Sequence, residues 1–187
     1  MRNLFVVFIC SLGSVLSATA QEKTLTDKYV GFIPSVLVEP YDTVDAVEVN
    51  FLPFLYEFRM GDNKDLGFQI RPILNYRFLK EQNGFSQIGG TLVMNKYFLN
   101  VFDEGFWLTP QLGVYFTYAY NRLDKIQTMT LGVEPGAFMQ ISKNFSLSVN
   151  LQPGINYYPD AFSQDFVETE SGIKPHFGII FHIGYNF

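Results

Sequence analysis

KPHFGIIFHIGYNF, residues Lys174–Phe187, carries the clearest structural pattern of this chain. Counted in steps of two from Phe187 back to Phe177, the residues are all aromatic or branched aliphatic. The residues between them are Gly, Asn and His, with a single Ile. Successive side chains of a strand point to opposite faces, so the stretch predicts a β-strand with one apolar and one mostly polar face.

The same period of two recurs along the chain and predicts seven further strands. They are expected at residues 29–38, 47–60, 66–80, 86–99, 106–121, 128–141 and 145–158. These segments exceed the roughly five or six residues of an average strand in a soluble protein. They reach the roughly nine to eleven residues that a tilted strand needs to cross a bilayer.

Two irregularities interrupt this pattern. The alternation changes phase within the second segment, between Phe51 and Phe54, which predicts a β-bulge near Leu52 and Pro53. Prolines also recur inside the segments, at Pro34, Pro53, Pro72, Pro110, Pro135, Pro153 and Pro175. Proline cannot donate to a ladder and is normally found at edges or bulges. We therefore expect bulges or breaks in the ladder at these prolines.

The two faces of the strands differ in a way that predicts which one is inside. The polar face consists mostly of Gly, Ser, Thr, Asn and Gln, whereas a water-facing surface carries about a quarter to a third charged residues. The apolar face ends in aromatic residues, as in a lipid-facing belt. The prediction is an all-β protein, a single closed antiparallel up-and-down transmembrane β-barrel of eight strands with a polar, plugged interior. The alternative is a secreted, lipocalin-like barrel with its apolar side chains inside.

The first twenty residues differ from the rest. Arg2 precedes an apolar, uncharged stretch from Leu4 to Leu16, and Ala18-Thr19-Ala20 is a small-x-small cleavage site. This pattern predicts a cleaved secretory signal peptide at 1–20 and a barrel domain at 21–187. Cys10, the single cysteine, lies in the signal, so the mature chain is expected to have no disulfide. The net charge of −5 and the lack of a basic run argue against nucleic acid as a partner.

Loop lengths indicate an orientation. Outer-membrane barrels have short periplasmic turns and longer external loops. With both termini in the periplasm, the connections at 61–65, 101–105 and 142–144 fall inside and are short. The longest loop, 159–172, falls outside.

The mature chain resembles the small eight-stranded outer-membrane barrels of Gram-negative bacteria, of the OmpA transmembrane-domain and OmpX-like type. The specific match is the end of the chain, with Phe187 last and Tyr185, Ile183 and Phe181 before it in steps of two. The resemblance implies that these residues are an assembly signal read by the barrel-assembly machinery. It also implies outer-membrane location, contact with outer-membrane lipid and periplasmic chaperones, and a monomeric state.

Five residues are predicted to form a polar network in the lumen: Arg71, Arg77, Glu134, His176 and His182. Unpaired charges in a narrow lumen are costly, so ion pairs are expected among them. Glu57, Arg59 and Lys174 are further candidates, and Tyr97, Trp107, Tyr115 and Phe138 are expected to fill the remaining space. His176 and His182 share a face but lie about 20 Å apart along a strand, which is too far for one metal ion. No metal or cofactor is expected.

The sequence leaves several functions open. The first is a non-catalytic structural or surface-interaction protein of the outer membrane. The second is a small, porin-like pore, or a barrel that binds and transports lipid or another small molecule. The third is a lipid A-modifying enzyme, for which Ser163 or Ser171 near His176 is the only constellation. It matches no recognised motif, so we expect no enzyme activity.

Overall fold

The computed structural model describes residues 25–34, 36–40, 45–78, 83–98, 107–123, 125–142, 144–159, 162–164, 167–169 and 172–187. The predicted signal peptide lies outside these residues. Within the described part, every regular element is a strand, and no helix is long and apolar enough to cross a membrane.

The strands fall into three groups. The long wall strands are β5 (Leu66–Phe78), β6 (Gly84–Tyr97), β7 (Trp107–Asn121), β8 (Ile126–Gln140), β9 (Phe145–Tyr158) and β12 (Gly172–Asn186). Four shorter strands, β1 (Lys28–Phe32), β2 (Val36–Pro40), β3 (Asp45–Asn50) and β4 (Phe54–Met60), make up two more wall segments. A small hairpin, β10 (Phe162–Gln164) and β11 (Val167–Thr169), stands apart from the wall.

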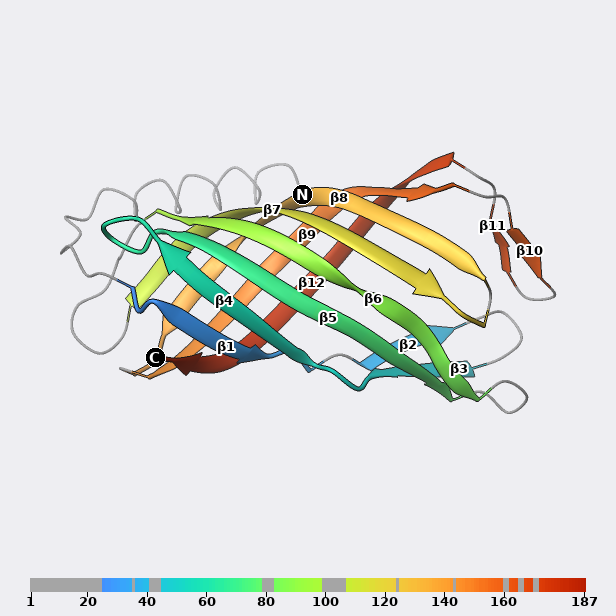
Figure 1. Ribbon diagram of the computed structural model, residues 1–187, viewed down its shortest axis with the longest axis horizontal. Helices are drawn as coiled ribbons and strands as arrows, with labels where there is room; N and C mark the ends of the chain where they lie inside the picture. Colours follow the sequence, from blue (N-terminus) through green and yellow to red (C-terminus); the bar gives the residue numbers. More distant parts are fainter. Residues whose placement is uncertain are drawn as a thin grey trace, which may run out of the picture.

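These strands close into an antiparallel barrel (Figure 1). β1 pairs with both β12 and β4, and β5 pairs with both β4 and β6, so the ring has no end. The all-β, eight-stranded closed barrel predicted from the sequence is thereby confirmed. We call the end that holds Phe187 and the β4–β5 turn the proximal end, and the end beyond which the β10–β11 hairpin projects the distal end (Figure 1).

Several expected boundaries need correction. The segments expected at 29–38 and 47–60 are each divided, into β1 and β2 and into β3 and β4, because proline and the bulge interrupt them. The last strand begins at Gly172, where φ is +132°, rather than at Lys174. The region predicted as the longest loop contains the β10–β11 hairpin.

The predicted bulge is present in the second wall segment. Phe32 pairs with Phe54, and Val36 pairs with Val49. The first segment advances by four residues between these pairs, whereas the second advances by five, so the second segment contains one extra residue. The amide oxygen of Asn50 accepts hydrogen bonds from the backbone N–H groups of Leu52 (2.9 Å) and Leu74 (3.3 Å). The extra residue shifts the phase, so that Phe54 and Phe58 face outward while Glu57 and Arg59 face inward.

The prolines lie where the ladder is interrupted. Among the described residues, β8 and β9 are paired up to Gly132–Gly154 and again from Gly136–Asn150, but not between. The Ile141 N–H donates to the Phe145 carbonyl, so odd-numbered residues of both strands direct their backbone groups into this ladder. Pro135 and Pro153 are odd-numbered and lie in the gap, so neither nitrogen deprives a continuous ladder of a donor.

The same rule accounts for other prolines. Pro72 lies on β5 between the part paired with β4 and the part paired with β3, beside the bulge. Pro110 lies one residue beyond Gln111, the last residue of β7 that pairs with β6. The expected break is therefore present at Pro72, Pro135 and Pro153, on one side of the strand only, while the other side stays paired. At Pro110 the carbonyl still accepts a hydrogen bond from the Phe98 N–H, at 2.9 Å.

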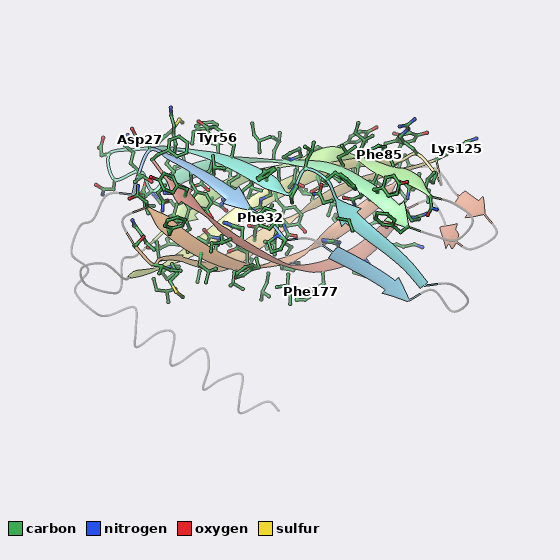
Figure 2. The ribbon with its side chains drawn as sticks, turned by 90° about the horizontal axis from the view of Figure 1, so that it is seen from below. Asp27, Phe32, Tyr56, Phe85, Lys125 and Phe177 are labelled. Atoms are coloured by element: carbon green, nitrogen blue, oxygen red, sulfur yellow. The ribbon has the colours of Figure 1, made fainter. Side chains whose placement is uncertain are left out.

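The apolar faces point outward, away from the barrel axis. Phe177, Ile179 and Phe181 are 66%, 68% and 41% exposed. Figure 2 shows Tyr56, Phe85 and Phe177 projecting from the outside of the wall. Exposed large apolar side chains occur on all the long wall strands and on β1 and β4, and the buried charged side chains lie inside, whereas Lys28, Lys96 and Lys174 are exposed near strand ends. The lipocalin-like alternative is therefore wrong, because it requires the reverse arrangement.

Candidate functional site

The lumen is the candidate site, because the polar residue types of the strands converge there. The inward side chains are largely buried although many are polar or charged: Glu57, Arg59, Gln69, Arg71, Arg77, Asn95, Gln111, Glu134, Asn150 and His182. An eight-stranded barrel has an interior just wide enough for side chains to fill it. These groups must therefore satisfy one another or water.

A proximal plug surrounds Arg59. Its guanidinium carbon lies 4.7 Å from the ring centroid of Phe138, 5.2 Å from that of Tyr97 and 5.5 Å from that of Tyr29. Cation–π contacts of this kind contribute about 0.5–2 kcal/mol each, with the larger values in desolvated sites. Three aromatic rings and one cation thus fill the barrel near its proximal end.

Glu57 balances the charge of this plug. Its carboxylate accepts hydrogen bonds from the Arg59 Nε and the Gln69 amide, and the Tyr97 hydroxyl donates to Glu57 Oε2 at 2.7 Å. Both members of the Arg59–Glu57 pair are fully buried at the side chain. A buried carboxylate needs this many donors, because its loss of hydration is otherwise uncompensated.

A second ion pair crosses the lumen at mid-height. Arg71 on β5 donates from Nη1 and Nη2 to Oε2 and Oε1 of Glu134 on β8, at 2.7 and 2.6 Å. The Arg71 Nε also donates to the Gln69 amide oxygen at 3.0 Å, and the Gln152 amide donates to Glu134 Oε2 at 2.7 Å. This bidentate geometry is the strong form of an Arg–carboxylate contact. It ties together two strands that are not neighbours.

The two histidines lie in different surroundings. His182 is fully buried, with its Nδ1 2.9 Å from the Tyr29 hydroxyl and its Nε2 3.5 Å from the Asn150 amide nitrogen. His176 is half-buried, with its ring 6.3 Å from that of Tyr115. Within the described residues, no three His, Cys, Asp or Glu side chains group closely enough to hold a metal ion.

A cavity of about 450 Å³ occupies the distal half of the lumen. We call it the distal cavity. Arg71, with its partner Glu134, lies on the side of the cavity toward the proximal plug. Its lining is mainly hydroxyl and amide groups, with a few apolar side chains: Ile33, Asn50, Arg71, Pro72, Ile73, Asn75, Gln87, Thr91, Tyr115, Thr117, Ala119, Thr128, Thr130, Gln152, Asn156, Tyr158, His176 and Ile180. The lumen is therefore filled proximally and hollow distally.

The structure brings together only some of the predicted lumen residues. Arg71 and Glu134 pair directly, whereas Arg77 is buried six residues further along β5. Glu57 and Arg59, which the phase change made ambiguous, form the plug. Tyr29 was not predicted to belong to the site. The signal for it was available, because Tyr29 shares the parity of Gly31 and Ile33 in the first segment.

The remaining predicted residues lie on the surface or outside the described part. The four residues of the predicted assembly signal all face outward: Phe181, Ile183, Tyr185 and Phe187. The Tyr185 ring contacts those of Phe145 and Phe187. Ser171 and the side chain of Ser163 lie outside the described residues, so the geometry of the alternative catalytic constellation is not defined.

The fold and the outward apolar belt define the class as membrane-type β-barrels, with a polar lumen and an apolar exterior. No family model and no curated protein matches the chain. Among solved structures, the chain is similar to the NMR solution structure of the E. coli Outer Membrane Protein W, with a TM-score of 0.41 and 10% identity over 88% of this chain and 99% of that one. A likeness of this size says nothing about function, which has to come from the geometry of the lumen.

Proposed function

We propose that the protein is an integral outer-membrane β-barrel with a structural, non-catalytic role and a lumen closed to ion flow. The exposed apolar belt supports membrane integration, and the predicted signal peptide supports export. The single observation that carries the closed lumen is the proximal plug, in which Arg59 lies among three aromatic rings and pairs with Glu57. The β10–β11 hairpin at the distal end is available for surface interactions (Figure 1).

Conductance in planar bilayers tests this proposal. The mature chain is expected to insert without producing stable current steps, because Arg59 and three aromatic rings fill the lumen near its proximal end. Arg59→Ala combined with Phe138→Ala should create steps by removing the cation and one ring. Steps from the unmodified chain, at the frequency seen for the double variant, would overturn the closed lumen and favour the narrow pore.

A second candidate, a small-molecule binding barrel, is favoured by the distal cavity. Its volume lies within the range of about 300–1,000 Å³ that is usual for ligand sites.

An enzyme that modifies lipid A is the third possibility. Unchanged lipid A masses in cells with and without the protein would support the non-catalytic role, and a mass difference would contradict it.

A further inference from the structure

The barrel wall is incompletely paired beside β12. Among the described residues, β12 pairs with β1 only from Ile183 to Asn186, and β2 pairs with β3 alone. The Phe187 N–H donates to the Lys28 carbonyl, so alternate residues of β12 direct their backbone groups toward the first wall segment. Phe177, Ile179 and Phe181 are three such residues, and no described strand pairs with them there. We call the unpaired gap between residues 177–181 of β12 and the described residues that follow Phe32 in the first wall segment, 33–34 and 36–40, the seam.

Prolines flank the seam on both sides. Pro175 has the parity of Phe187, and Pro34 has the parity of Lys28, so both nitrogens point into the seam. Each proline removes an N–H that would otherwise lack a partner. The sequence therefore reduces the number of unpaired donors in this gap, as it does at Pro135 and Pro153.

The seam adjoins the distal cavity. Ile33 from the first segment and Ile180 and His176 from β12 all line the cavity. Unpaired backbone at membrane depth is tolerated only where it is buried in protein or borders a water-filled cavity. The seam is therefore a place where the polar lumen and the surrounding lipid meet without an intervening ladder.

The lining of the cavity is chemically divided. Threonine, asparagine, glutamine and tyrosine side chains come mainly from β6 to β9, which run from the wall opposite the seam round to the strand next to β12. Ile33, Ile73 and Ile180 come from the first segment, β5 and β12. Arg71 is the single Lys, Arg, Asp or Glu among the lining residues, and Glu134 already binds it in a bidentate pair. Among the described lining residues, the cavity therefore offers mainly hydrogen-bonding groups, and its one permanently charged side chain is already paired.

We propose that the distal cavity binds an amphipathic molecule with an uncharged, polyhydroxylated head group, whose alkyl chain leaves through the seam into the lipid. The hydroxyl and amide groups of the lining match a sugar-like head, which both donates and accepts hydrogen bonds. Ile33 and Ile180, which lie beside the seam, offer apolar contacts to the first carbons of the ligand's alkyl chain. This inference rests on the membrane placement proposed above and goes beyond it by naming the ligand class and its route.

Fluorescence quenching tests the route. Trp107 is the single tryptophan, so Trp107→Phe removes the protein's own tryptophan fluorescence, and each reporter is added to this variant. Ile180→Trp reports on the seam, Thr117→Trp on the opposite wall and Phe177→Trp on the outer surface. In vesicles of phosphatidylcholine with brominated acyl chains, Ile180→Trp should be quenched several-fold more than Thr117→Trp, since chains reach it through the seam. Ile33→Trp is the second seam reporter if Ile180→Trp does not fold.

Each outcome of this measurement is informative. Quenching of Ile180→Trp, or of Ile33→Trp in its place, that is no stronger than that of Thr117→Trp would overturn the route. Unquenched Phe177→Trp would instead contradict the membrane placement itself. The two failures are thus distinguishable.

Ligand binding is tested with octyl glucoside and octyl sulfate on the mature chain in phosphatidylcholine nanodiscs, with empty discs as the baseline. Saturation-transfer NMR should show contact between the protein and the sugar protons of the glucoside. Ala119→Trp, which fills the cavity from β7, should reduce this signal several-fold. Tyr118→Trp, its outward-facing neighbour, should leave it unchanged. Equal binding of the sulfate, or full binding by Ala119→Trp, would overturn the proposal.

Discussion

At the scale of single residues, the lumen is held by charges that satisfy each other. Arg71 and Glu134 come from β5 and β8 and have almost no solvent contact. Gln69 and Gln152 complete their hydrogen bonds, so neither charge is left without a partner. Such a pair contributes little over an apolar substitute, but removing one member leaves a buried charge.

The variant Arg71→Met is expected to lower the free energy of unfolding by about 3–5 kcal/mol, because Glu134 loses its cation. The double variant Arg71→Met/Glu134→Gln should recover most of that loss, since no buried charge remains and Gln152 keeps a partner. Urea unfolding in lipid vesicles measures both. A double variant no more stable than the single one would contradict this account.

Glycine at the inner face makes room for the large side chains. A Cβ on Gly132 would lie 2.4 Å from the Pro153 carbonyl oxygen and 2.6 Å from the Tyr115 hydroxyl. Gly132→Ala should therefore destabilise the barrel by about 1–3 kcal/mol, the usual cost of overpacking. Gly90→Ala is the matched control, because its Cβ would meet only the Arg71 carbonyl oxygen at 3.4 Å. Equal unfolding midpoints for the two variants would show that the neighbouring strands shift enough to accommodate the added methyl group at little cost in stability.

At the scale of the strands, proline and pairing are matched. Pro72, Pro135 and Pro153 lie where the nitrogen faces a ladder gap, so the barrel keeps long strands while leaving defined breaks. The clearest case is the shared gap of Pro135 and Pro153. A break there leaves both strands paired on their other sides, so the wall stays closed.

Replacing both prolines tests whether they cause the break. Pro135→Val/Pro153→Val restores two N–H groups that point into the β8–β9 ladder. We expect both new amides to become protected from hydrogen exchange, to the level of Ala137 and Val149, which already pair across these strands. Rapid exchange at 135 and 153 would mean that the surrounding strands, and not the prolines, hold the gap open.

The end of β12 carries the predicted assembly signal. Phe187→Ala should reduce the amount of folded protein in the outer membrane several-fold, because the resemblance implies recognition of this aromatic end. Phe177→Ala removes the same ring from the same face of the same strand and is expected to have little effect. Heat-modifiable mobility on gels of membrane fractions distinguishes folded from unfolded chains. Equal loss for both variants would assign the effect to the apolar belt instead.

At the scale of the whole molecule, one barrel wall has a mainly polar inner face and a mainly apolar outer face. The exterior offers lipid a nearly uninterrupted apolar belt, and the interior is filled proximally and hollow distally. The closed end supports the proposed non-conducting role, and the hollow end with its seam supports the proposed ligand.

An arginine in the belt tests the lipid-facing surface. Leu131 is exposed near the middle of β8, and Leu131→Arg should lower the free energy of unfolding in vesicles by about 2–4 kcal/mol. Phe98, just beyond the end of β6, is also exposed, and the same change there should cost about 0–1 kcal/mol, as expected near an interface. Similar losses of unfolding free energy at both positions would contradict the placement of Leu131 in the lipid core and of Phe98 near its edge.

The strands, the barrel and the outward direction of its apolar face could all be predicted from the amino-acid sequence. Alternation of period two is a local property, so the outward position of Phe177 and the bulge near Leu52 and Pro53 could be predicted from neighbours in the chain. The contacts across the lumen, such as those of Arg71 with Glu134 and of Arg59 with three rings, could not be predicted in this way. Strand register and closure set those contacts, and they also set the seam. The distal cavity is likewise a property of the closed ring, because the volume left inside depends on how all the inner faces pack together.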